Sequence, residues 1–223
     1  MNLTPVKAPL VVQKLFPKYT WEIASNTKEI YLTFDDGPTP EITNWVLNTL
    51  KQYQAKATFF CIGNNIEKHP EIFQNIIQEG HAIGNHTHNH VKGWKTSVPQ
   101  YLDNVEKAQQ IIDLNKPNTA DNKSKDTTTH TKLFRPPYGQ IMPKQGTALI
   151  KLGYKIIMWS VLSIDWDKFV SRKVCLSNVI TKAGSGSIIV FHDSIKASKN
   201  MQYALPKVLE YYSKKGYTFK SLY

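Results

Sequence analysis

YLTFDDGPTP (residues 31–40) joins an apolar run to two adjacent aspartates, Asp35 and Asp36. The run predicts a buried strand, and such a strand seldom ends in neighbouring carboxylates, because each charge must be solvated, paired or bound to a metal. A turn explains Gly37 and Pro38, but it does not require a doubled negative charge. We therefore expect a polar site directly after this strand.

Short apolar strands alternate with amphipathic helices along the rest of the chain. This alternation is typical of a parallel sheet, either open or closed into a barrel, with about seven strands and six intervening helices. The expected strands are 29–34, 56–62, 81–85, 132–134, 154–160, 187–191 and 217–220, and the expected helices are 40–53, 69–80, 98–114, 143–153, 171–184 and 200–216.

The chain is expected to form one main domain over residues 28–223, with an N-terminal extension over 1–27 that packs on it. Residues 115–132 contain few apolar side chains and many Asn, Lys, Asp and Thr residues, which predicts a flexible polar loop. Because this loop leads from a helix into a strand, it should lie opposite the carboxyl ends of the strands. His130 is therefore expected on the surface, outside any site.

The formal charge of the 223 residues is +11, from 28 Lys and Arg against 17 Asp and Glu. A positive balance favours acidic partners, but the basic residues are scattered, whereas nucleic-acid footprints usually cluster. We predict a solvated basic surface and no nucleic-acid partner. Arg135 and Arg172 are the only arginines, which marks positions where a two-pronged guanidinium is needed.

Cys61 and Cys175, the only cysteines, lie in apolar segments and are predicted to be buried thiols. The N-terminal apolar run APLVV is too short for a signal peptide, and no stretch reaches about eighteen apolar residues. The chain is therefore expected to lack a transmembrane segment and to be cytoplasmic, or secreted or periplasmic if a leader was removed. The oligomeric state is left open.

Titratable or aromatic polar side chains follow the ends of five separate strands. In parallel α/β folds these ends gather at one face, where active sites form. The general polarity of loops accounts for any one of these groups but poorly for five of them. The residues are Asp35 and Asp36; His86, His88 and His90; Arg135; Asp165 and Trp166; and His192 and Asp193.

His86 and His90 are four residues apart, so on a helical turn both imidazoles point the same way. Two imidazoles with one carboxylate suit zinc above all, and also cobalt or nickel. His88 competes because alternate residues share one side of a strand, but we treat it as a bystander. One aspartate of the 35–36 pair is expected to bind the metal, and the other to stay free as a base oriented by Arg135.

Five ordered motifs resemble those of the NodB-homology polysaccharide deacetylases, which form carbohydrate esterase family four. The resemblance extends from about residue 28 to residue 220, and the complete ordered set is highly specific. It implies a distorted, NodB-like (β/α) barrel with fewer than eight full strands, and it makes 28–223 the deacetylase domain. The motifs are TFDDG (33–37), HTHNH (86–90), RPPYG (135–139), IDW (164–166) and VFH (190–192).

The resemblance also implies the reaction, which is metal-dependent removal of N-acetyl or O-acetyl groups from a carbohydrate such as peptidoglycan or a chitin-like oligosaccharide. Arg135 would hold the base, Asp165 would tune the acid, and the Tyr138 N–H would face the oxyanion. By this resemblance the catalytic residues are Asp35 (base), His192 (acid), Arg135 and Asp165; the metal ligands are Asp36, His86 and His90; and the substrate-binding residues are Tyr138, Trp166 and Val190.

Two positions depart from the family pattern. Leu162 stands where the fourth motif often has an earlier aspartate, which affects the hydrogen bonding around the site. Val190 stands where leucine is usual, which enlarges the acyl pocket. Neither change removes a residue that the chemistry requires.

Two other functions remain open, namely hydrolysis of a non-sugar C–N bond and glycan binding without turnover. An acid and a base favour an enzyme, because binding alone needs neither. Trp94 is expected either to stack on sugar rings at the mouth of the barrel or to be buried by packing. Lysines in the segments 91–95 and 192–200 would suit an anionic glycan.

Overall fold

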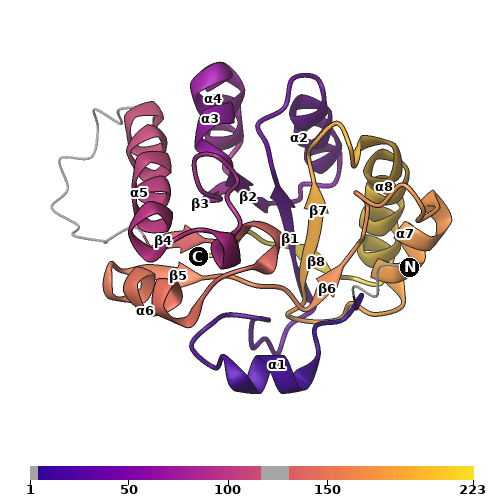
Figure 1. Ribbon diagram of the computed structural model, residues 1–223. Coiled ribbons are helices and arrows are strands. Elements are labelled where there is room, and N and C mark those ends of the chain that lie inside the picture. Colours follow the sequence, from indigo (N-terminus) through magenta and orange to yellow (C-terminus); the bar gives the residue numbers. More distant parts are fainter. Residues whose placement is uncertain (1–4, 117–130) are drawn as a thin grey trace, which may run out of the picture.

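A curled parallel sheet forms the centre of the molecule in the computed structural model, which describes residues 5–116 and 131–223 (Figure 1). The strands follow the order β5-β4-β3-β2-β1-β7-β6, and β8 pairs with β1. This arrangement confirms the predicted α/β barrel with about seven parallel strands. The strands are β1 (Glu29–Asp35), β2 (Ala57–Cys61), β3 (Ala82–Asn85), β4 (Lys132–Phe134), β5 (Tyr154–Ile156), β6 (Val161–Leu162), β7 (Ile188–His192) and β8 (Thr218–Phe219).

Helices surround the sheet in Figure 1. Their apolar faces pack on it, because the large core cluster joins residues of β1, β2 and β7 to residues of the flanking helices. No helix in the two described ranges is long and apolar enough to span a bilayer. The helices are α1 (Leu10–Leu15), α2 (Ile42–Gln52), α3 (Gly63–Lys68), α4 (Pro70–Gln78), α5 (Val98–Asn115), α6 (Pro143–Lys151), α7 (Arg172–Ile180) and α8 (Ser198–Lys214), with 3₁₀ turns at Gly93–Lys95 and Pro137–Gly139.

The register of the sheet aligns the carboxyl ends of its strands. Asp35 at the end of β1 is the partner of His192 at the end of β7. On the other side, Asn85 of β3 pairs in register with Phe134 of β4, so the residues that follow them also start side by side. Parallel pairing therefore brings groups from distant parts of the chain to one rim.

The N-terminal segment links the two edge strands, β5 and β6. The Ala8 N–H donates to Ser160 O at 3.1 Å, the Thr20 N–H donates to Ile156 O at 2.9 Å, and the Met158 N–H donates to Thr20 O at 2.7 Å. Among the described residues no ladder joins β5 directly to β6. These contacts satisfy backbone groups that the open side of the barrel leaves unpaired. The assignment of 1–27 as a separate extension stays a prediction.

The predicted strand 154–160 is wrong at its carboxyl end. Strand β5 stops at Ile156, and after a crossing segment the separate strand β6 begins at Val161. In the crossing segment the Ile157 N–H donates to Phe134 O at 2.8 Å and the Ser160 N–H donates to Ile188 O at 3.1 Å. The segment thus changes partners from β4 to β7, and the apolar run YKIIMWS did not reveal that change.

Cys61 and Cys175 are buried and free, as predicted. The rings of Phe34 and Phe59 stack with centroids 5.0 Å apart, and Phe191 extends the stack from β7. Helices α1 and α3 were not predicted, because each has only six residues. Residues 117–130, including His130, lie outside the described residues, so the flexible loop stays a prediction.

Candidate active site

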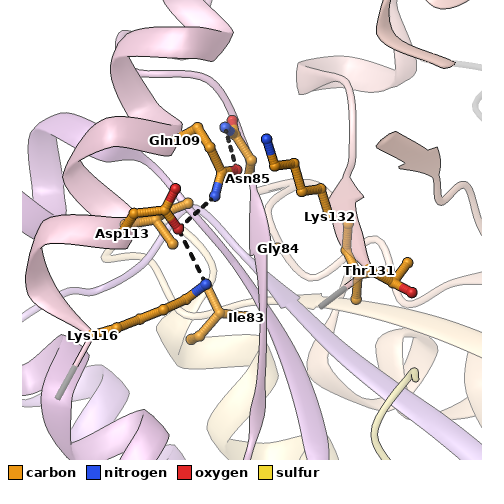
Figure 2. Close-up of a pocket in the computed structure, with 10 residues that line it drawn as sticks. Ile83, Gly84, Asn85, Gln109, Asp113, Lys116, Thr131 and Lys132 are labelled. Atoms are coloured by element: carbon orange, nitrogen blue, oxygen red, sulfur yellow. Dashed lines mark hydrogen bonds and ion pairs between the residues drawn. The ribbon is translucent and has the colours of Figure 1, made fainter. Parts of the chain in front are cut away.

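A hollow of about 210 Å³ lies among α5, β3 and β4 (Figure 2). Its polar side chains bind one another: Gln109 Nε2 donates to Asp113 Oδ1 at 3.0 Å, and Lys116 Nζ lies 3.2 Å from the same oxygen. None of the predicted site residues lines it. We assign no catalytic function to this hollow.

A larger cleft of about 910 Å³ opens at the carboxyl ends of the strands. Eight of the ten predicted site residues line it. The other two, Arg135 and Asp165, lie behind the wall with exposed fractions of 0% and 1%. The lining residues are Asp35, Asp36, His86, His90, Tyr138, Trp166, Val190 and His192.

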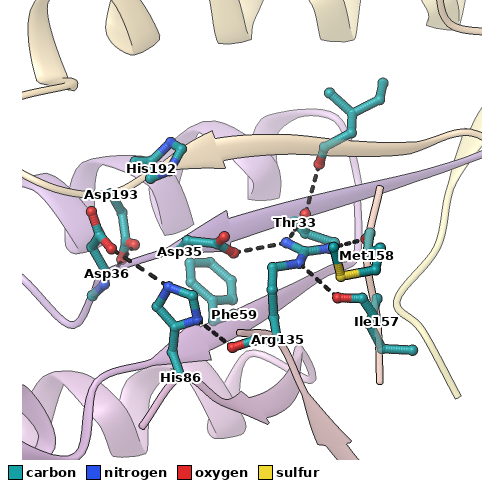
Figure 3. A network of polar contacts seen from close by, with 12 residues as sticks. Thr33, Asp35, Asp36, Phe59, His86, Arg135, Ile157, Met158, His192 and Asp193 are labelled. Atoms are coloured by element: carbon teal, nitrogen blue, oxygen red, sulfur yellow. Dashed lines mark hydrogen bonds and ion pairs between the residues drawn. The ribbon is translucent and has the colours of Figure 1, made fainter. Parts of the chain in front are cut away.

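Asp36, His86 and His90 each place one ligand atom within 4.8 Å of the others. Asp36 Oδ1 lies 3.2 Å from His90 Nε2 and 3.7 Å from His86 Nε2; Figure 3 draws the second contact. His86 Nδ1 lies 2.8 Å from Arg135 O. Because a carbonyl can only accept, Nδ1 carries the proton and the Nε2 lone pair is left free for a ligand bond.

This triad fits a divalent cation. Asp36 Oδ1 is buried and has no hydrogen-bond partner among the described residues. A buried carboxylate oxygen is costly unless it is paired or bound to a metal. Burial lowers the pKa of His86 to about 3, with a further contribution from His90, and so favours the neutral imidazole that binds metals.

The backbone around the triad lies in conformations that L-residues rarely adopt. Asp36, His90 and Tyr138 have φ angles of 83°, 52° and 59°. Each such residue costs on the order of 1–3 kcal/mol and persists only where its surroundings hold it. Asn65 of α3 supplies one such restraint, because its Nδ2 donates to Asp36 O at 2.7 Å. Sequence analysis missed Asn65, since it missed the short helix that carries it.

The carboxylate of Asp35 is held by the buried guanidinium of Arg135 (Figure 3). Arg135 Nη1 donates to Asp35 Oδ1 at 2.7 Å and to Thr33 Oγ1 at 2.6 Å. Nε and Nη2 donate to the carbonyl oxygens of Ile157 and Met158 at 3.2 and 2.9 Å. A guanidinium fixed at all three nitrogens gives Asp35 one orientation, with the carboxylate in the cleft wall.

The imidazole of His192, the register partner of Asp35, forms a second ion pair at the same rim of the cleft. Its Nδ1 lies 2.8 Å from Asp165 Oδ1, and its backbone N–H donates to Asp165 Oδ2, also at 2.8 Å. Burial lowers the pKa of His192, but the charge of Asp165 and its hydrogen bond outweigh burial and raise the pKa to about 9. His192 therefore carries a proton at neutral pH, as a general acid requires.

An apolar wall lies beside the His192–Asp165 pair, where the rings of Trp166 and His192 have centroids 4.8 Å apart. Leu162, Ile164 and Val190 form a buried cluster against which Trp159 and Trp166 pack. Leu162 is the register partner of Val190. The position where the resemblance would place an aspartate therefore belongs to this apolar wall. On the other side, the Tyr138 ring lies 4.5 Å from the His90 ring, with Lys92 Nζ 4.8 Å from its centroid.

Trp94 and His88 do not line the cleft. Trp94 is 66% exposed, so the buried alternative is wrong, and it does not line the cleft either. His88 lies outside the triad, and its Nε2 is 3.5 Å from Glu67 Oε2. The lysine that lines the cleft from the segment 192–200 is Lys196, and Lys68 of α3 lines it as well.

A curled parallel sheet that brings an Asp–His–His triad and two buried ion pairs to one cleft has the features of a metal-dependent barrel hydrolase. The chain belongs to the polysaccharide deacetylase family, whose model matches residues 22–157. This membership confirms the predicted family and the predicted enzyme class, a hydrolase of carbon–nitrogen bonds other than peptide bonds.

Curated relatives and a solved structure support this assignment over nearly the whole chain. The chain is 35% identical to a peptidoglycan-N-acetylglucosamine deacetylase of Bacillus cereus, over 92% of this chain and 71% of the relative. It is 30% identical to the peptidoglycan-N-acetylmuramic acid deacetylase PdaA of Bacillus subtilis, over 100% of this chain and 81% of the relative. A peptidoglycan N-acetylglucosamine deacetylase crystallised with 4-naphthalen-1-yl-N-oxidanyl-benzamide superimposes with a TM-score of 0.83 at 33% identity, covering 96% of this chain and 95% of that one.

Proposed function

We propose that this protein hydrolyses the N-acetyl groups of peptidoglycan sugars, releasing acetate and a free amine. The observation that carries this proposal is the arrangement of the cleft, in which a fixed carboxylate and a protonated imidazole flank the Asp36, His86 and His90 triad. The names of the relatives support peptidoglycan as the substrate. An acetyl group on oxygen is the nearest alternative for the same site.

Three side chains are proposed to hold one divalent ion, namely Asp36, His86 and His90. When bound, the ion supplies polarisation of the acetamide carbonyl and lowers the pKa of water. Two neutral imidazoles and a carboxylate favour zinc, and cobalt and nickel suit the same set.

Asp35 is the proposed general base. Its carboxylate lines the cleft one residue before Asp36, and it accepts a proton from the attacking water. The guanidinium of Arg135 holds the carboxylate in place. The Tyr138 N–H is proposed to donate to the oxyanion that forms, an effect typically worth about 3 kcal/mol per donor.

His192 is the proposed general acid. An amine leaves poorly as an anion, so the C–N bond breaks only as the leaving nitrogen gains a proton. Asp165 holds the imidazole by Nδ1, which leaves Nε2 as the nitrogen that donates. Trp166 and Val190 are proposed to contact the methyl of the acetyl group, because both belong to the apolar wall of the cleft.

The positive charges of the cleft indicate which polymer it binds and in which compartment the protein acts. Lys68 and Lys196 line its outer part, and positive groups suit the carboxylates of peptidoglycan better than a neutral chitin-like chain. Since peptidoglycan lies outside the cell membrane, this substrate favours the secreted or periplasmic alternative over the cytoplasmic one.

Acetate release tests the proposal directly. The full chain should release acetate from N-acetylated peptidoglycan, and faster than from N-acetylated chitooligosaccharides. A chelator should abolish release, and added Zn²⁺, Co²⁺ or Ni²⁺ should restore it. Measuring the new free amines separates N-deacetylation from O-deacetylation, because only the former creates them.

Two results would count against this function. Binding of glycan without acetate release would assign a non-catalytic protein, and release only from non-sugar amides would assign another amidohydrolase. A matched variant, His88→Asn, should keep activity, because His88 lies beside the triad but outside it.

A further inference from the structure

Asp193 follows the proposed acid His192, yet the proposed mechanism gives it no role. It is fully buried, and Figure 3 places it beside Asp36. Its backbone N–H donates to Asp35 O at 3.1 Å. Its side chain, however, turns to the loop after β1, where Oδ1 accepts the Gly37 N–H at 3.0 Å and Oδ2 accepts the Thr43 hydroxyl at 2.6 Å. A buried carboxylate with this many partners restrains the segments that it joins.

Thr43 extends this restraint to the far side of the same turn. Its Oγ1 accepts the Thr39 N–H at 2.8 Å, so its own proton is free to bind Asp193. The carboxylate therefore holds the turn at Gly37 directly and at Thr39 through Thr43. A Cβ built on Gly37 would overlap the Asp193 carboxylate, so only glycine lets the two approach. The glycine of the TFDDG motif thus has a specific packing reason.

The peptide unit between Asp36 and Gly37 decides where the Asp36 side chain points. Asp36 has a φ of 83°, which an aspartate does not keep without restraints. Two other contacts hold carbonyl groups: Asn65 Nδ2 donates to Asp36 O at 2.7 Å, and the Ile62 N–H donates to Gly37 O at 3.0 Å. Asp193 supplies the restraint on the N–H side of this peptide unit.

We propose that Asp193 is a positioning residue for metal binding, which holds the Asp36–Gly37 peptide unit so that Asp36 Oδ1 faces His86 and His90. The inference rests on the proposed function, because it assigns Asp193 a part in the same metal site. Groups that orient metal ligands typically change metal affinity or activity by about 10–100-fold, and Asp193 would do so through the backbone next to Asp36. A purely structural Asp193 would instead stabilise the fold and leave the metal affinity unchanged.

Direct metal titration separates the two roles. In the full chain, Asp193→Ala should weaken Zn²⁺ binding about 10–100-fold in a chelator competition, and it should alter the visible bands of the Co²⁺ form. The kcat should fall while KM for glycan stays near its wild-type value, because Asp193 does not line the cleft. Asp193→Asn keeps an acceptor for the Gly37 N–H and should recover part of the lost affinity.

A milder pair of variants covers the case in which Asp193→Ala does not fold. Thr43→Val removes the hydroxyl link at nearly constant volume and should weaken Zn²⁺ severalfold, whereas Thr43→Ser should restore binding. Thr58→Val is the matched control, because Thr58 is also fully buried and its Oγ1 accepts the Leu222 N–H at 2.9 Å. It should lower the free energy of unfolding and leave Zn²⁺ affinity unchanged.

The outcomes distinguish the two proposals. If wild type binds no divalent ion, the proposed function fails and this inference fails with it. If wild type binds Zn²⁺ but Asp193→Ala and Thr43→Val bind it equally well and only unfold more easily, Asp193 is structural and the inference alone is overturned. Equal losses in Asp193→Asn and Asp193→Ala would overturn positioning by hydrogen bonds.

Discussion

Two ion pairs at the rim of the cleft have the same construction but opposite orientations. In one pair the carboxylate of Asp35 faces the cleft, and the buried cation Arg135 stands behind it. In the other pair the cation His192 faces the cleft, and the buried carboxylate of Asp165 stands behind it. The partner that faces the substrate differs, and so does the chemistry available to it.

The cations of the two pairs, Arg135 and His192, differ in how readily they lose a proton. Arginine stays protonated in proteins, so Arg135 remains a hydrogen-bond donor to Asp35. Imidazole titrates near neutrality, and the charge of Asp165 moves that titration upward. One pattern of burial and pairing thus holds both the proposed base and the proposed acid at the rim of the cleft.

The largest expected effect follows from removing the negative charge that Asp35 presents to the cleft. Asp35→Asn keeps the shape of the side chain but cannot accept a proton, so kcat should fall about 10³-fold. Zn²⁺ affinity should stay close to that of wild type, because Asp35 is not in the triad. Steady-state kinetics and metal titration measure the two quantities. A parallel loss of metal would assign Asp35 to the metal site instead.

Exchanging the hidden cation is expected to have the next largest effect. In Arg135→Lys a single ammonium cannot reach Asp35, Thr33 and the two carbonyl oxygens that the guanidinium binds. The kcat should fall about 10²-fold through loss of the base's orientation. The free energy of unfolding should fall by about 3 kcal/mol, because buried acceptors lose their donors.

The second arginine provides the matched control. Arg172 is exposed, and its guanidinium lies 5.0 Å from the Tyr203 ring without pairing to a carboxylate among the described residues. The expectation that this position needs a two-pronged guanidinium is therefore wrong. Arg172→Lys should change the free energy of unfolding by no more than about 0.5 kcal/mol and leave kcat alone. Equal behaviour of the two variants would mean that the buried fork of Arg135 gives no advantage over a point charge.

The sequence predicted the meeting of these groups because parallel pairing is a local rule with long-range consequences. Once β1 and β7 lie side by side in parallel, Asp35 and His192 must end at the same rim. The doubled carboxylate and the two histidines pointed to the triad without reference to packing. The helical turn expected to align His86 and His90 was wrong, because residues 86–90 form no helix and Thr87 and His90 have positive φ angles. These signals depend on residue type and spacing, and both can be read from one chain.

The parts that were not predicted depend on contacts between distant segments. The split between β5 and β6 arises from bonds of Met158 to Thr20 and of Ser160 to Ile188, and no local pattern encodes those partners. The link from Asp193 to Thr43 spans 150 positions in the sequence. Asn65 lies on a six-residue helix with no periodic signal long enough to detect.

A shift in the pH dependence of kcat tests the His192–Asp165 pair. Because the pKa of His192 is raised to about 9, the protonated acid persists through neutral pH, and kcat should fall as pH rises through that value. Asp165→Asn removes the charge that raises the pKa, while burial continues to lower it. The alkaline limb of kcat should therefore move to lower pH by more than about one unit.

The size of this effect depends on pH, which provides an internal control. At pH 8 the variant should be slower than wild type by about twofold or more, and the difference should shrink as the pH is lowered and both imidazoles become protonated. A uniform loss at all pH values would mean that Asp165 only orients His192. Asp165 would then position His192 without changing its pKa.

The smallest expected effect concerns the apolar wall beside the His192–Asp165 pair. Val190 is 1% exposed and packs with Leu162 and Trp166, so a larger side chain there would narrow the space proposed for the acyl methyl. Val190→Leu should lower the ratio of kcat/KM for N-propionyl over N-acetyl glycan about tenfold, because one methylene in an apolar pocket is worth about 1–3 kcal/mol. Turnover of the N-acetyl substrate should change little, since neither ion pair is touched. An unchanged ratio would mean that the acyl group lies elsewhere in the cleft, and the acid and the base would then have to approach the amide from a different side.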